Sequence, residues 1–337
     1  MPKTTFEFHD LEKAKLSIYL DAVAYDRKGN CNYINSLNKL AYEALPKELL
    51  DIFLRQKNSK TPLPYILIEN VPTDSAITAV PLQNECASRF KTGSRSESLL
   101  IMLSSLLGEP YSMVFEGAEI VNNLIPYKET AKHYTGLGSN VELDFHIENA
   151  ALKHFSPYNF SPMGLMLTGV NLDENGPVTR VSDGRQALTL LSEEEQEILS
   201  SHLFRIKVPH RWRSEKYGIP QTETEWVPIL HNRNGAYPEL SAVFYKDMIK
   251  AKTPEAQNAL NKLHKAVKTV SVGISLKPGQ LLYIDNRFAL HSRDMFEPTI
   301  ENGRPKRWVQ RVFVSPNLWG HRNLHEIDDR IYEVKAC

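Results

Sequence analysis

The chain has 337 residues, and its 40 basic and 40 acidic side chains leave a formal net charge of zero. Hydrophobic residues make up 42% of the sequence and charged residues 24%, which is ordinary for a globular protein that buries a full core. Balanced charge gives no basic surplus for nucleic acid or for an anionic membrane surface, so we expect neither as a partner.

The cysteines and the N-terminal segment point to a reducing compartment. Cys31, Cys86 and Cys337 are odd in number and widely spaced, which argues against a disulfide framework and against a cysteine metal site. The first residues, MPKTTFEFHDLEKAK, are polar where a signal peptide has an apolar core, and no run approaches the roughly 20 apolar residues that span a bilayer. We expect a cytoplasmic protein. A homo-oligomer is compatible with the sequence, which leaves the oligomeric state open.

Residues 1–110 predict a mainly helical part. Apolar residues recur at helical spacing from Ile34 to Leu54, and they do so again in SESLLIMLSSLL before Gly108 and Pro110 end the pattern. Between these two segments, TPLPYILIENVP predicts a strand that enters a sheet.

After Pro110 the pattern changes to short strands separated by turn residues. SPMGLMLTGV, SHLFRIKV and PGQLLYIDN are examples, and regular short strands of this kind predict a sandwich or barrel. Two helices interrupt them, one beginning at a capping box of Ser192 and Glu195 and one at Thr253 and Pro254. We expect one domain over residues 1–337, with a helical part at 1–110, a β core at 111–316 and a C-terminal extension at 317–337.

Two distant segments supply a set of metal-binding residue types. His146 and Glu148 lie in VELDFHIE, and His291 lies in PGQLLYIDNRFALHSRDMFEP. If the first segment is extended, side chains two residues apart share a face, so His146 and Glu148 point the same way. Two imidazoles and one carboxylate form the facial triad that holds Fe(II) and leaves open positions for reactants. An H-x-E pair alone is weak evidence, because such pairs also occur by chance.

A strand near the C-terminus carries two arginines on one face. In RWVQRVFV a period of two places Arg307, Val309, Arg311 and Phe313 together. A guanidinium group beside apolar neighbours is poorly solvated, so it is unfavourable there unless it binds an anion. The planar guanidinium can donate two parallel hydrogen bonds to a carboxylate. The strand therefore predicts a substrate or co-substrate that bears a carboxylate.

The order of several motifs resembles a known enzyme family. LLGEP, EGAEIVNNLIP, GSNVELDFHIEN, NGPVTRVSDGRQAL and PGQLLYIDNRFALHSRDMFEP, followed by RWVQRVFV, occur in this order in the clavaminate-synthase-like, TauD-related branch of the Fe(II)/2-oxoglutarate dioxygenases. The resemblance runs from about Leu103 to Pro316 and is closest to members that hydroxylate free lysine and arginine. It implies an α+β protein with a mainly β core, a double-stranded β-helix or jelly roll, with N-terminal and inserted helices.

The resemblance also implies roles for individual residues. His146, Glu148 and His291 correspond to the iron ligands, Arg307 to the partner of the distal carboxylate of 2-oxoglutarate, and Thr179 to a hydrogen-bonding residue of that co-substrate. Arg311 corresponds to the arginine that holds the substrate carboxylate, and Glu116 lies near a position that contacts the α-amino group. The loop between His291 and Arg307 is longer than in the family, so an exchange of the two arginine roles stays open.

The choice of substrate depends on charges near the site. A free basic amino acid also needs an acid for its distal cation. The resemblance implies Asp247 for this role, because the arginine hydroxylases of the family carry acidic residues in the corresponding segment before their helix, and Ser139 is a further candidate for a hydrogen bond to the substrate. Asp247 also lies beside Lys246, where a solvated charge near a helix start would be equally ordinary. We predict L-lysine because a compact ammonium needs fewer acids than a guanidinium, with L-arginine or another polar amino acid as alternatives.

The resemblance implies a hydroxylation that uses Fe(II), 2-oxoglutarate and O₂ and releases succinate and CO₂. Two other classes remain open. A zinc hydrolase could use two histidines and a glutamate, but no H-E-x-x-H string occurs. A jelly-roll protein that only binds ligands would explain the fold but not the two arginines beside a triad.

Overall fold

The computed structural model describes residues 4–82, 85–132, 134, 137–155, 159–213, 221–235, 237–245 and 247–334. Cys337 lies outside these ranges, while Cys31 is exposed, Cys86 is half-buried, and both are free thiols. No helix in the described ranges has the length and apolar character needed to cross a bilayer.

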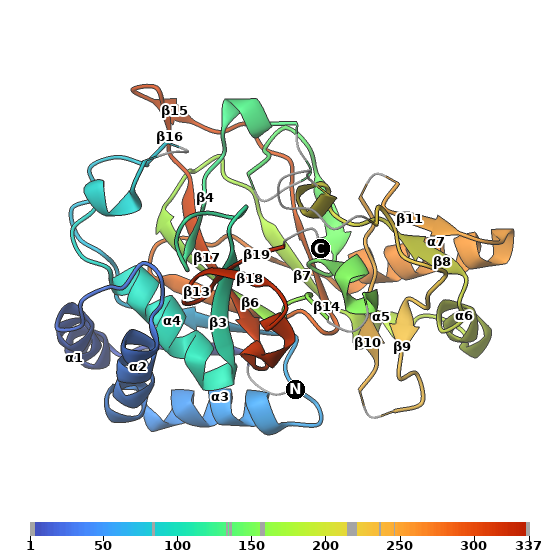
Figure 1. The fold of residues 1–337 in the computed structure, drawn as a ribbon, viewed down its shortest axis with the longest axis horizontal. Coiled ribbons are helices and arrows are strands. Elements are labelled where there is room, and N and C mark those ends of the chain that lie inside the picture. The colour runs from blue at the N-terminus through green and yellow to red at the C-terminus, as the bar shows by residue number, and fades with distance from the viewer. Residues whose placement is uncertain are drawn as a thin grey trace.

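A large mixed sheet forms the centre of the molecule (Figure 1). In spatial order its described strands are β1 (Thr5–Glu7), β2 (Tyr65–Glu69), β13 (Gln280–Asp285), β6 (Gly164–Asn171), β17 (Trp308–Ser315), β3 (Glu109–Met113), β19 (Ile331–Glu333) and β18 (His325–Asp328), and β4 (Asn122–Leu124) also pairs with β17. Strand β17 is buried along its whole length, because α4 packs on one face and the second sheet lies on the other.

The second sheet has four described strands. Their order is β12 (Val272–Ile274), β7 (Thr179–Asp183), β14 (Ala289–Arg293) and β5 (Leu143–His146). One pocket is lined by residues of both sheets, so the sheets face each other across it. This arrangement of two facing sheets corresponds to the predicted jelly roll.

The N-terminal helices lie together at one end of the molecule (Figure 1). They are α1 (Asp10–Asp21), α2 (Cys31–Ala44), α3 (Lys47–Asn58) and α4 (Arg95–Leu107). The apolar pattern from Ile34 to Leu54 is divided between α2 and α3. Leu45 is extended, with ψ of 146°, because the residue before a proline is pushed out of the helical region by Pro46.

Three helices pack near the four-stranded sheet at the opposite end of the molecule (Figure 1). They are α5 (Gly184–Leu188), α6 (Glu193–Leu199) and α7 (Pro254–Val270). The predicted capping box of Ser192 and Glu195 is confirmed at the start of α6, and the Thr253 side chain caps α7 as expected. The buried face of α7 includes Ala256, Leu260, Leu263 and Val267.

Short elements complete the described chain. Pairs of small strands are β8 (Phe204–Ile206) with β11 (Ile249–Ala251), β9 (Leu230–His231) with β10 (Glu239–Leu240), and β15 (Ile300–Glu301) with β16 (Arg304–Pro305). The 3₁₀ turns are η1 (Ala87–Arg89), η2 (Lys128–Thr130), η3 (Ala150–His154), η4 (His210–Arg213) and η5 (Leu318–His321).

The loop before Arg307, for which the resemblance implies additional residues, contains a hairpin. Its middle is the β15–β16 hairpin, and Asn302 and Gly303 at the turn have φ of 51° and 77°. An Asn-Gly pair with both residues at positive φ is the favoured two-residue hairpin turn. The middle of this loop is therefore an exposed hairpin that precedes β17.

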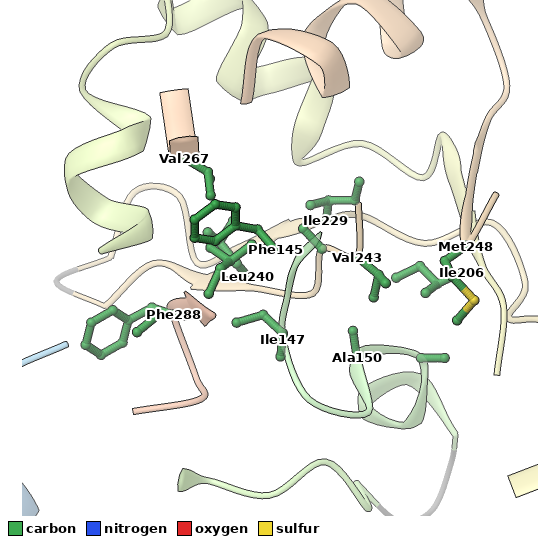
Figure 2. Close-up of a cluster of buried hydrophobic side chains, with 14 of the residues drawn as sticks. Phe145, Ile147, Ala150, Ile206, Ile229, Leu240, Val243, Met248, Val267 and Phe288 are labelled. Carbon is green, nitrogen blue, oxygen red and sulfur yellow. The ribbon is translucent and has the colours of Figure 1, made fainter. Parts of the chain in front are cut away.

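Alternation at the end of β5 separates the core from the site. Phe145 and Ile147 are buried in the hydrophobic cluster that includes Leu240, Val267 and Phe288, as Figure 2 shows. Since successive side chains of an extended chain point to opposite faces, His146 and Glu148 turn away from this cluster toward the space between the sheets. The apolar neighbours thus fix the direction of the polar residues.

The terminal parts of the chain contribute to the same large sheet. β1 and β2 form one edge, and β18 and β19 form the other, where β19 pairs with β3 in parallel. The expected single domain, with boundaries at 110 and 316, stays a prediction.

Candidate active site

His146, Glu148 and His291 form one cluster. His146 ends β5 and lies directly opposite His291 of β14, so the strand register brings the two imidazoles together. Their ring centroids are 4.3 Å apart, and Nε2 of His291 is 3.9 Å from Oε2 of Glu148. One ligand atom from each of the three residues lies within 4.8 Å of the others.

The chemistry of this cluster fits a divalent iron ion. Burial lowers the pKa of both histidines, and the neighbouring His146 lowers that of His291 further, so both imidazoles are neutral ligands. Nδ1 of His146 lies 2.9 Å from the backbone carbonyl oxygen of Asp144. This contact is a hydrogen bond only if Nδ1 carries the proton, which leaves the lone pair of Nε2 for a metal. Two neutral imidazoles and one carboxylate are the donor set of the Fe(II) triad.

Asn286 holds the backbone of Glu148 in place. The amide N–H of Glu148 donates to Oδ1 of Asn286 at 2.7 Å, and Nδ2 of Asn286 donates back to the carbonyl oxygen of Glu148 at 3.1 Å. The Asn286 side chain is fully buried and follows directly after β13. Sequence reasoning missed this residue, although a pair of polar residues, Asp285 and Asn286, directly after the apolar run LLYI was a visible signal.

Most of the predicted site residues share the pocket between the sheets. It is lined by His146, Glu148, His291, Thr179, Arg307 and Arg311, together with Arg293 and apolar residues that include Leu124 and Leu167. Thr179 lies opposite Arg293 in the β7–β14 pairing. The pocket therefore brings the triad, the threonine and both predicted arginines together.

Arg307 and Arg293 make one end of this pocket strongly cationic. Their guanidinium groups lie 5.6 and 5.5 Å from the centre of the same ring, Phe296. Among the described residues no carboxylate lies within 4 Å of either group, and their hydrogen bonds go only to backbone carbonyl oxygens. Burial lowers the pKa of each arginine to about 10. A buried and a half-buried cation with no carboxylate within 4 Å are unfavourable unless an anion binds between them.

Arg293 was not predicted from the sequence. It follows His291 by two residues in β14, so the same period of two that paired His146 with Glu148 could have found it. Its proximity to Arg307, however, depends on the packing of the two sheets.

Arg311 forms an ion-pair network with two glutamates. Its Nη2 lies 2.7 Å from Oε2 of Glu116, its Nη1 lies 3.5 Å from Oε2 of Glu148, and the guanidinium lies 4.2 Å from the ring centre of Phe313. Glu116 also accepts from Nη1 of Arg211 at 2.8 Å. Burial alone would raise the pKa of Glu116, but the charges of Arg211 and Arg311 outweigh it and hold the pKa below its usual value. Arg211 was not predicted as a site residue from the sequence.

Two predicted substrate residues are placed differently. Ser139 is buried, its hydroxyl donates to Oδ1 of Asn140 at 3.1 Å, and its carbonyl oxygen accepts from the backbone N–H of Phe296. Asp247 is exposed at a turn with φ of 56°, a conformation that aspartate tolerates. Neither residue is among those that line the pocket, and their contacts with substrate stay predictions.

Residues 96–313 match the model of the "Taurine catabolism dioxygenase TauD, TfdA family". The chain belongs to this dioxygenase family. The match confirms the resemblance seen between Leu103 and Pro316, and it begins within α4 and ends within β17. It also confirms the expected enzyme class, with Fe(II) as the metal cofactor and 2-oxoglutarate and O₂ as co-substrates, over a zinc hydrolase or a binding protein without activity.

Two curated relatives of this dioxygenase act on amino acids. This chain is 27% identical to an L-lysine 3-hydroxylase of Catenulispora acidiphila over 264 residues, which cover 77% of this chain and 69% of the relative. It is 26% identical to an L-asparagine oxygenase of Streptomyces coelicolor over 293 residues, which cover 86% of this chain and 82% of the relative.

Solved structures confirm the fold of the dioxygenase. A crystal structure of asparagine oxygenase with Fe(II), 3-hydroxyasparagine and succinate superposes with a TM-score of 0.82, covering 99% of this chain and 100% of that chain at 22% identity. The iron oxygenase OrfP with iron and α-ketoglutaric acid superposes with a TM-score of 0.78, covering 98% of this chain and 100% of that chain at 22% identity. The predicted jelly roll with additional helices is therefore confirmed.

Proposed function

We propose that this dioxygenase hydroxylates an unactivated C–H bond of a free L-α-amino acid. The observation that carries the proposal is the pairing of Arg311 with Glu116 beside the triad, at 2.7 Å. A guanidinium next to a carboxylate complements the carboxylate and ammonium groups of an α-amino acid, and charge-assisted hydrogen bonds to both would orient its α-carbon. The amino-acid chemistry of the curated relatives supports this assignment.

The residues around the pocket divide the remaining tasks. His146, Glu148 and His291 would hold the iron, which supplies the O₂ activation and the oxidising power when bound. Arg307 would bind the distal carboxylate of 2-oxoglutarate, with Arg293 as a second cation and Thr179 as a hydrogen-bonding neighbour. The absence of a described carboxylate within 4 Å of the two arginines supports an anion at this end of the pocket.

L-Lysine is the substrate that we propose first, and the relationship to a lysine 3-hydroxylase supports it. A specific observation favours L-asparagine as a second candidate. Among the described residues the acids near Glu116 already have cationic partners, since Glu119 pairs with Arg27 and Glu85 pairs with Arg304. A neutral amide side chain would need no unpaired acid in this region.

A panel of free amino acids tests the proposal. The protein would be loaded with Fe(II) and 2-oxoglutarate without oxygen, mixed with each amino acid, exposed to O₂ and analysed by mass spectrometry. We expect one member of the panel to gain one oxygen atom with a matching yield of succinate. If Fe(II) and 2-oxoglutarate bind but no free amino acid is oxidised, the proposed substrate class is wrong.

Replacing Asp247 by Asn tests its predicted contact with the distal ammonium of lysine. We expect the KM for lysine to rise by roughly two- to fivefold, because the pair would be solvent-exposed and exposed ion pairs contribute little. Norleucine, which lacks the ammonium, should bind equally well to both proteins. An equal loss for lysine and norleucine would contradict the contact and assign Asp247 to the turn that it occupies.

The cytoplasmic location, the absence of a nucleic-acid partner and the oligomeric state stay predictions from the sequence. A small-molecule partner is consistent with the pocket between the sheets.

A further inference from the structure

The 3₁₀ turn η4 is anchored to the segments that carry both glutamates of the site. Trp212 is buried, and its Nε1 donates to Oδ1 of Asn149 at 3.1 Å, one residue after Glu148. Its ring also meets that of Phe115, the residue before Glu116, edge-on at 5.0 Å. Because Trp212 is held on both sides, the backbone of the adjacent Arg211 is fixed relative to the site.

Arg211 and Arg311 hold the same oxygen atom of Glu116. Nη1 of Arg211 and Nη2 of Arg311 donate to Oε2 at 2.8 and 2.7 Å. No described residue donates a hydrogen bond to Oε1, and Glu116 lines a second cavity together with Asn122 and Asn123. The two guanidiniums thus fix the carboxylate through one oxygen and leave the other available as an acceptor.

We propose that Arg211 is a positioning residue for the substrate: it fixes Glu116 so that Oε1 accepts from the α-ammonium group. This inference rests on the proposed function. When the substrate carboxylate takes hydrogen bonds of Arg311, that arginine is drawn toward the substrate, and Arg211 remains as the cation that orients Glu116. A fixed acceptor is more effective than a mobile one, because the cost of ordering it is not added to binding.

The charges are consistent with this arrangement. Arg311 and Glu116 together match the zwitterion of an amino acid, and Arg211 places a second cation on the half-buried carboxylate of Glu116. Without Arg211, Glu116 would depend on Arg311 alone, the residue for which the substrate carboxylate competes. The binding of the ammonium group should therefore depend on Arg211, while the binding of 2-oxoglutarate at Arg307 should not.

Arg211→Gln tests the proposal, with Arg211→Lys as the conservative variant. Arg205→Gln is the matched control, because Arg205 also donates to a glutamate, Glu223, at 2.8 Å but lies outside the pocket lining. Dissociation constants of the amino acid identified in the panel would be measured by calorimetry on anaerobic protein loaded with Fe(II) and 2-oxoglutarate. We expect roughly tenfold weaker binding for Arg211→Gln, substantial recovery in Arg211→Lys, and no change in the control.

A comparison of two ligands separates positioning from general support of the fold. The α-hydroxy acid with the same side chain lacks the ammonium group and should bind Arg211→Gln about as well as it binds the unchanged protein. The preference for the amino acid over the hydroxy acid should fall by roughly tenfold in the variant, with the affinity for 2-oxoglutarate unchanged.

Several results would overturn the inference. Equal losses for the amino acid and the hydroxy acid, or a loss of 2-oxoglutarate binding in both Arg211 variants, would assign Arg211 to the support of the fold. Unchanged amino-acid binding in Arg211→Gln would show that Glu116 needs no second cation. Failure of the unchanged protein to bind any amino acid would instead reject the proposed function, and the inference with it.

Discussion

Replacing Glu148 by Ala is expected to abolish hydroxylation and to weaken iron binding by at least about 100-fold. Even the residues that orient metal ligands contribute roughly 10- to 100-fold to metal affinity, so the loss of a charged ligand should cost at least as much. The fold should persist, because Phe145 and Ile147 pack into the neighbouring cluster independently of Glu148. Iron content, succinate formation and thermal unfolding would be measured on the same preparation.

Glu142→Ala is a suitable control for this experiment. Glu142 is an exposed carboxylate in the same segment, just before β5, and it does not line the pocket. Its removal should leave iron content and activity unchanged. Full hydroxylation by a folded Glu148→Ala protein would rule out the triad.

Arg307→Ala and Arg311→Ala are expected to affect different ligands. Arg307→Ala should raise the KM for 2-oxoglutarate, and Arg311→Ala should raise the KM for the amino acid. Each variant loses charge-assisted contacts worth about 1.5–3 kcal/mol in a buried site, which corresponds to roughly 10- to 100-fold. Steady-state kinetics with one substrate varied at a time would separate the two effects.

Arg304→Ala provides the control for the arginine pair. Arg304 lies in the β15–β16 hairpin and pairs with Glu85, so its removal takes away a guanidinium from the same loop without touching the pocket lining. If the two site variants gave the opposite pattern of KM changes, the proposed roles of Arg307 and Arg311 would have to be exchanged.

Local patterns in the sequence were sufficient for the parts of the fold that depend on near neighbours. Capping by Ser192 and Thr253 was predictable because these side chains bond to backbone groups within the next turn. The common direction of His146 and Glu148 was predictable because the side chains of an extended chain alternate. The division of the pattern from Ile34 to Leu54 into two helices also had a local cause in Pro46, which was overlooked.

Partners far apart in the chain were not predictable from such patterns. Arg211 and Glu116 are 95 residues apart, and Asn286 and Glu148 are 138 residues apart. No periodicity links residues at these separations, because their meeting depends on how strands from two sheets and a 3₁₀ turn pack around one pocket.

The sequence by itself therefore determined the residue types and spacing of the triad, the arginine-bearing strand and the family to which these motifs belong. Tertiary structure alone decided which charges compensate one another. It left Arg293 and Arg307 without a described carboxylate partner, joined Arg211 and Arg311 on one glutamate, and placed Asp247 on an exposed turn. The physical reason is that spacing along the strand sets the face on which a side chain lies, whereas its charge is compensated by groups from other segments that only sheet packing brings within hydrogen-bond distance.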